Sequence, residues 1–89
     1  GEIDWRMSSE SIDNLIKALA HPYMGAHFLY NNKVIKVWKS KYVIQNLDNI
    51  EPGKVLSTAT NHCAIKTGDG IIQLLDWNPA IQFKEGDYL

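Results

Sequence analysis

After residue 25 the sequence is interrupted by turn-forming residues so often that no long helix fits there. Asn31-Asn32, Pro52-Gly53 and the run "GDG" at residues 68–70 separate short stretches rich in β-branched and aromatic residues. The Asn pair tolerates the positive φ angles of a tight hairpin. Pro52-Gly53 suits the central pair of a type II turn. Residues 26 onward therefore predict a series of short antiparallel strands.

The exception lies at the beginning of the chain, where the sequence predicts one short amphipathic helix. Four apolar residues recur there at helical spacing: Ile12, Leu15, Ile16 and Leu19. Ser8 is placed to cap the helix, because its hydroxyl can accept from a free amide of the first turn. The helix should end by Ala20, since Pro22 forces the residue before it out of the α region.

One helix followed by five or six short strands predicts a mainly β fold, a small antiparallel barrel or sandwich. The last strand of this series would be an edge strand formed by "AIQFKEGDYL". With 89 residues and 45% hydrophobic content, residues 1–89 predict a single domain with one core. We expect Trp5 and the apolar face of the helix to belong to that core.

Composition narrows the setting as well as the fold. No apolar run approaches the roughly 20 residues of a membrane span. The first ten residues, "GEIDWRMSSE", do not have the pattern of a targeting signal. The single Cys63 cannot form an internal disulfide. We therefore expect a cytoplasmic protein with no membrane partner.

Residues that could carry chemistry are scattered. None of the histidines forms a helical metal-binding pair, so no metal site is predicted: His21, His27 and His62. Cys63 is expected to be a buried structural thiol rather than a nucleophile. Three carboxylates near the helix are expected to be solvated surface charges: Asp4, Glu10 and Asp13. The sequence predicts no self-sufficient active site.

The net charge of −1 gives no general attraction to nucleic acid, but four lysines gather in one run: Lys33, Lys36, Lys39 and Lys41. In a regularly alternating strand, Lys33 and Lys39 would share one face and Lys36 would lie on the other. This split favours a solvated or edge-protecting role. Contact with nucleic acid is the alternative, and both remain open at this point.

Several short motifs, in this order, resemble the C-terminal domain of the formyltransferase family: "IDW" at 3–5, "SIDNLIKAL" at 11–19, "PYMGA" at 22–26, "IKVW" at 35–38, "PGKV" at 52–55, "IKTGDG" at 65–70 and "GDYL" at 86–89. The resemblance covers nearly the whole chain and implies a small, open, OB-like antiparallel barrel. Two positions depart from the family pattern. Met24 replaces the second proline of the turn, and Lys17 replaces an arginine of the helix.

The resemblance implies an accessory domain of a longer enzyme. The catalytic domain of that family is a separate Rossmann-like unit, and its spaced Asn-x-His motif is absent here, because Asn61 and His62 are adjacent. We therefore expect this chain to have no catalytic residues and to bind no cofactor. In the parent enzyme, 10-formyltetrahydrofolate would give a formyl group to the acceptor, and the N-terminal catalytic domain would be a partner of this chain.

Two acceptors are compatible with the resemblance. The low net charge, the single arginine and the ending "GDYL" favour a nucleotide-linked amino sugar, so the first interpretation is a sugar-nucleotide N-formyltransferase. The alternative is the tRNA-binding C-terminal domain of a methionyl-tRNA formyltransferase.

The run "HPYMGA" at 21–26 supplies the candidate site. Pro22 and Gly25 are explained by the end of the helix and the start of the first strand. Tyr23 is not explained in this way, because its flat ring with a polar tip suits a wet interface. We therefore predict that Tyr23, with His21 beside it, lines the junction with the catalytic domain and the acceptor's nucleotide pocket. A purely structural ring is the alternative.

Overall fold

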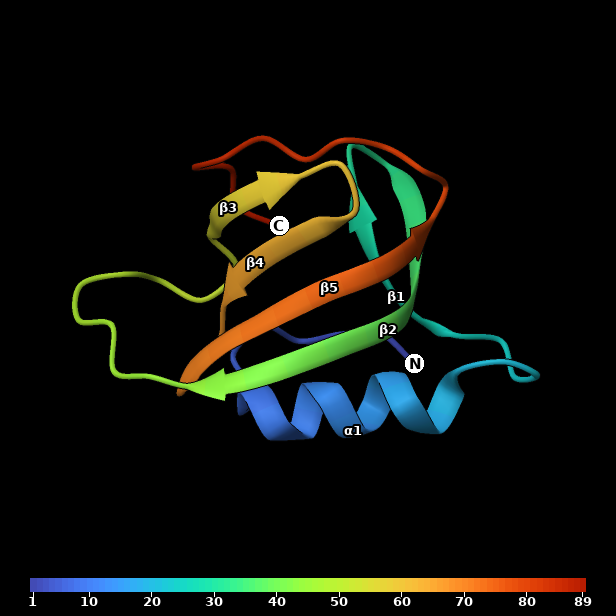
Figure 1. The fold of residues 1–89 in the computed structure, drawn as a ribbon, viewed down its shortest axis with the longest axis horizontal. Coiled ribbons are helices and arrows are strands. Elements are labelled where there is room, and N and C mark those ends of the chain that lie inside the picture. The colour runs from blue at the N-terminus through green and yellow to red at the C-terminus, as the bar shows by residue number, and fades with distance from the viewer.

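The computed structural model describes all of residues 1–89 and contains one helix and one five-stranded sheet (Figure 1). The elements, in chain order, are α1 Ser9–Leu19, β1 Ala26–Tyr30, β2 Lys33–Ile44, β3 Val55–Ala59, β4 His62–Lys66 and β5 Gly70–Asn78. The strand order is β1-β2-β5-β4-β3, and every neighbouring pair is antiparallel. The predicted mainly β, open antiparallel architecture is confirmed.

Helix α1 begins and ends where the sequence predicts. The Ser8 hydroxyl accepts a hydrogen bond from the Ser11 amide at 3.1 Å, which satisfies one free donor of the first turn. At the other end, Ala20 leaves the helical conformation two residues before Pro22. Ile12 and Ile16 are fully buried, whereas two other apolar residues of the stripe are only half-buried: Leu15 and Leu19.

The predicted turns also form. Asn31 and Asn32 have φ angles of 50° and 65° and connect β1 to β2 as a two-residue hairpin loop. In the turn before β3, Gly53 has a φ of 96°, and the Lys54 amide donates to the Glu51 carbonyl at 3.4 Å.

Strand β2 is longer and less regular than its sequence suggests. It runs for 12 residues, and its pairing with β5 shifts register on both sides of Lys39. Val37 lies opposite Trp77 and Lys39 opposite Asp76, so Trp38 has no opposite residue. Such a bulge bends the strand. Figure 1 shows β2 turning from the β1 hairpin to run alongside α1.

The gap between edge strands β1 and β3 is closed by residues 79–89, which run back across the curled sheet (Figure 1). Phe83 packs against Phe28, Tyr30 and Trp77, with ring centroids 5.1–5.7 Å apart. The Val55 amide of β3 donates to the Asp87 carbonyl at 2.7 Å. This tail is not the additional edge strand that its sequence suggested. It makes only an isolated bridge to Lys54, because its contacts are mainly aromatic packing and single hydrogen bonds.

The core lies between α1 and the inner face of the sheet. Trp5 is buried and meets Phe28 edge-on at 5.1 Å, as expected of a core aromatic residue. Cys63 is also buried, as predicted. Asp13 contradicts its predicted exposure: its side chain is 1% exposed, accepts from the Ser40 hydroxyl at 2.6 Å and pairs with Lys17 at 2.7 Å. Helix α1 turns this carboxylate towards Ser40 of β2, and Lys17, one turn further along the helix, is its second partner.

Candidate functional site

The turn from α1 to β1, residues 20–25, is held by two backbone hydrogen bonds. The Tyr23 amide donates to the Ala20 carbonyl at 3.0 Å, and the Gly25 amide donates to the Leu19 carbonyl at 2.7 Å. Gly25 has a φ of 88°, a conformation that glycine adopts without steric cost. The turn therefore presents its side chains from a defined backbone.

Trp38, the unpaired residue of the β2 bulge, anchors this turn. The His21 ring stacks on the Trp38 indole with centroids 3.8 Å apart and an interplanar angle of 13°. Gly25 also lies against the indole, because a Cβ at this position would come within 2.8 Å of it. The turn is thus held on β2 by an aromatic stack and by a close backbone approach.

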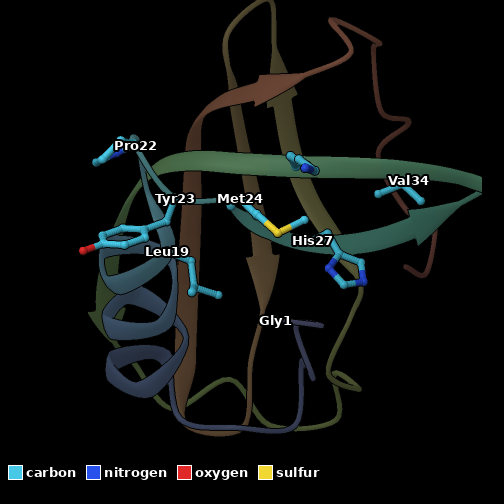
Figure 2. A pocket seen from close by; sticks show the side chains of 9 residues that line it. Gly1, Leu19, Pro22, Tyr23, Met24, His27 and Val34 are labelled. Carbon is cyan, nitrogen blue, oxygen red and sulfur yellow. The ribbon is translucent and has the colours of Figure 1, made fainter.

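An open hollow with a volume of about 680 Å³ lies beside the turn, and we call it the turn hollow. It is lined by Gly1, Leu19, Pro22, Tyr23, Met24, Gly25, His27, Val34 and Lys36. Figure 2 shows Leu19 of α1 and His27 of β1 on either side of Met24 in the view drawn. Side chains from the helix, the turn and the β1–β2 hairpin therefore meet at one corner of the molecule.

The two residues predicted to form a site have different positions. Tyr23 lines the turn hollow and is 65% exposed, so its ring is not part of the core. His21 does not line the hollow, because its ring is stacked on Trp38. Tyr23 thus lines the turn hollow together with Met24 and His27, whereas His21 does not.

Apolar side chains continue from the turn hollow onto the outer face of the β1–β2 hairpin. The register pairs His27 with Lys36 and Leu29 with Val34, and directly opposite residues share a face. Leu29 and Val34 are 54% and 50% exposed, and Met24 of the turn is 78% exposed. Exposed apolar residues gathered in this way are typical of an interaction surface.

Three lysines of β2 lie on the same outer face of the sheet: Lys36, Lys39 and Lys41, here called the lysine row. Lys39 lies opposite Asp76, and Lys41 opposite Gln73. Both of these β5 residues alternate with the buried Trp77 and Leu74, so they point outward. The split predicted from regular alternation is therefore wrong for Lys36 and Lys39, because the bulge at Trp38 shifts the alternation by one residue.

The lysine row makes no ion pair and no side-chain hydrogen bond within the chain. Three other cations are engaged. Arg6 pairs with Asp4 at 2.9 Å, Lys17 pairs with Asp13, and the buried Lys66 ammonium donates to the Thr67 carbonyl. The row is thus a group of free positive charges on a chain whose net charge is −1.

No feature of the chain resembles an activated catalytic group. Burial raises the pKa of the Cys63 thiol to about 12, so it is a poor nucleophile. No three His, Cys, Asp or Glu side chains lie together in an arrangement that could hold a metal ion. No helix is long and apolar enough to cross a membrane. The arrangement offers two binding surfaces, the apolar corner at the turn hollow and the lysine row.

Comparison with known proteins identifies the family of this chain. Residues 1–85 match the family model described as formyl transferase, C-terminal domain. The chain belongs to this family. This confirms the resemblance seen in its motifs and the OB-like class of its barrel.

Three similar curated proteins are each longer than this chain. A methionyl-tRNA formyltransferase of Caldanaerobacter subterraneus subsp. tengcongensis is 33% identical over 76 residues, which cover 85% of this chain and 24% of the relative. Those of Lactococcus lactis subsp. cremoris strain MG1363 and subsp. lactis strain IL1403 are 31% and 28% identical, each over 89% of this chain. This formyl transferase C-terminal domain spans about a quarter of the relatives it matches.

Proposed function

We propose that this chain is the C-terminal domain of a methionyl-tRNA formyltransferase and that the lysine row contacts the tRNA backbone. The observation that carries the proposal is the row itself, three unpaired lysines on one outer face. Phosphate groups are bound by such clustered cations. The names of the similar proteins support the same acceptor.

A sugar-nucleotide acceptor, the first interpretation from the sequence, has less support. It was based on the net charge of −1, the single arginine and the ending "GDYL". Net charge averages over the whole surface, whereas a phosphate backbone meets one face. The bulge at Trp38 also places Lys36 and Lys39 on one side, so the division of lysines between two faces, which had counted against contact with nucleic acid, does not occur.

In the proposed protein the chemistry takes place outside this chain. The formyl donor, 10-formyltetrahydrofolate, would bind in the N-terminal catalytic domain. In this chain Asn61 and His62 lie at the β3–β4 hairpin and do not form the spaced Asn-x-His motif. We assign no catalytic step to any residue of this chain. The proposal places the whole protein in the cytoplasm.

Tyr23 has a separate place in this proposal. We propose that its exposed ring borders the junction with the catalytic domain, at the turn hollow. His21 contributes indirectly, because its stack on Trp38 holds the turn in position. The apolar corner, which Lys36 borders, would thus serve the protein partner, and the rest of the lysine row, Lys39 and Lys41, would serve the nucleic acid.

The test of the lysine row is the salt dependence of tRNA binding by the whole enzyme. Lys39→Gln and Lys41→Gln should each weaken binding of initiator tRNA in fluorescence anisotropy. Each should also reduce the slope of log K against log salt by about 1, because each lysine releases about one counterion. Lys84→Gln is the matched control, since Lys84 is an exposed lysine of the tail, outside the row.

The comparison between these variants decides the matter. Unchanged affinity and slope in the double variant of Lys39 and Lys41 would contradict the proposal. An equal loss in Lys84→Gln would show a general charge effect rather than a site. Normal tRNA binding combined with formylation of an amino-sugar nucleotide would restore the first interpretation.

A further inference from the structure

The first residue of the chain is held at the edge of the sheet, beside the turn hollow. The His27 amide of β1 donates to the Gly1 carbonyl at 2.9 Å, and the Ile3 amide donates to the His27 carbonyl at 2.7 Å. These bonds form a short parallel bridge along β1. A Cβ on Gly1 would lie 2.9 Å from Leu19 Cδ1 and 3.4 Å from the Gly25 carbonyl oxygen. The backbone at Gly1 therefore fits between the end of α1 and the start of β1.

This geometry determines where a preceding residue would go. Because the bridge is parallel, a residue before Gly1 would run beside Gly25 and then beside Met24. The Gly25 amide already donates to the Leu19 carbonyl, and its φ of 88° turns the backbone out of the strand. The ladder with β1 therefore ends at Gly1. In a longer chain, the preceding residue would leave the sheet edge there, beside the turn hollow that Gly1 lines.

We propose that the segment directly preceding Gly1 in the longer protein occupies the turn hollow and packs an apolar side chain against Leu19, Tyr23 and Met24. This inference rests on the proposed function, in which the chain is the C-terminal part of a longer enzyme. The chain covers 24% of similar proteins and matches a C-terminal domain family, so most of such a protein would precede Gly1.

The character of the hollow selects an apolar occupant. Met24 and Tyr23 are 78% and 65% exposed, and Leu19 and Val34 add further apolar surface. Two polar side chains, His27 and Lys36, lie opposite each other on the hairpin. An apolar side chain seated on Met24 would remove this surface from water. It would also fix the direction in which the connecting segment leaves the domain.

Limited proteolysis and hydrogen exchange of the full-length protein test the proposal. The residues directly before Gly1 should be protected in the parent protein. In Met24→Asp, a buried charge would oppose docking, and cleavage in that segment should accelerate about tenfold. Ile44→Asp is the matched control, because Ile44 is 68% exposed at the end of β2 and lies outside both the lining of the hollow and the apolar hairpin surface beside it. It should leave the cleavage rate unchanged.

Two outcomes would overturn the inference: rapid cleavage already in the parent, or equal acceleration by Met24→Asp and Ile44→Asp. Met24→Ser provides a milder variant if the aspartate prevents folding, and it should give a smaller acceleration in the same segment. The salt slope of tRNA binding, measured for the Met24 variants and for the lysine variants, separates this inference from the proposed function. A mobile segment with a normal slope would remove only the docking, whereas a slope unaffected by the lysine variants would remove the tRNA function.

Discussion

Two carboxylates at helix α1 have partners within the chain, whereas the ammonium groups of the lysine row have none. Asp13 is almost fully buried and is held by Lys17 and the Ser40 hydroxyl. Asp69 accepts hydrogen bonds from the amide and the hydroxyl of Ser9, at 2.8 and 3.0 Å. The lysine row lies on the same strand as Ser40 but on its opposite face, and it forms no such contact.

Strand β2 serves two purposes through its two faces. Ser40 faces α1 and takes part in the structure, while its neighbours Lys39 and Lys41 face outward and are free to bind. A charge with a partner contributes to the fold, and removing it leaves a buried group unsatisfied. A free surface charge contributes little to stability, so its substitution mainly changes binding. Variants on the two sides should therefore separate stability from function.

The largest loss of stability should come from a buried residue of α1. Ile16→Ala removes a fully buried side chain of α1 and should lower the free energy of unfolding by about 2–5 kcal/mol. Leu15→Ala should cost less, because Leu15 is only half-buried. Chemical denaturation of the isolated domain measures both. Equal losses would show that Ile16 and Leu15 are equally buried in solution.

A smaller loss is expected at the anchored turn. Gly25→Ala should destabilise the domain by about 1–3 kcal/mol, because the new methyl group meets the Trp38 ring at a positive φ. Gly86→Ala is the matched control, since Gly86 has a φ of 90° and nothing within 4 Å of the added Cβ. The excess loss in Gly25→Ala, together with a changed Trp38 signal in near-UV circular dichroism, would measure the anchor. Equal losses would show that only the backbone conformation matters.

A substitution at the exposed part of the same turn should change function rather than stability. Tyr23→Ala should leave the melting temperature nearly unchanged, because the ring is mostly exposed. In the full-length enzyme it should raise the KM for the acceptor severalfold if the ring borders the domain junction. A lowered melting temperature with normal kinetics would make Tyr23 a structural residue and leave the turn hollow without this role.

Local signals in the sequence account for most of the fold. The Ser8 cap, the end of α1 before Pro22 and the Asn31-Asn32 hairpin each depend on neighbouring residues only, and all three form as predicted. The bulge at Trp38 was not predictable, because it depends on how β2 meets β5. For the same reason, the common face of the lysine row is visible only in the structure.

Contacts between side chains of distant segments could not be predicted from the sequence either. Asp13 reads as a surface charge in sequence, and only its contact with Ser40, 27 residues away, makes it a buried one. Tyr23 was identified because the turn left its ring unexplained. Met24 was noted only as a departure from the family pattern, although it is the most exposed apolar residue of the turn hollow. Its role depends on the hollow, which helix, turn and hairpin form together.

The smallest effect should appear in the pH dependence of stability at the start of α1. Hydrogen bonds from Ser9 lower the pKa of Asp69 below its usual value of 3.8. The folded state thus favours the carboxylate. Its contribution is present above the unfolded pKa and is lost as the pH falls through the folded pKa. The carboxylate is exposed, so the contribution should stay below about 1 kcal/mol.

Asp69→Asn isolates this contribution, because the amide oxygen can still accept from Ser9 but does not titrate. Between about pH 5 and about pH 2, the melting temperature of the variant should fall less than that of the parent. The other carboxylates, including the Asp4 that pairs with Arg6, titrate in both proteins and cancel in the difference. Parallel pH curves would show that Asp69 does not stabilise the start of the helix through its charge. The contrast between partnered carboxylates and the free lysine row would then rest on Asp13 alone.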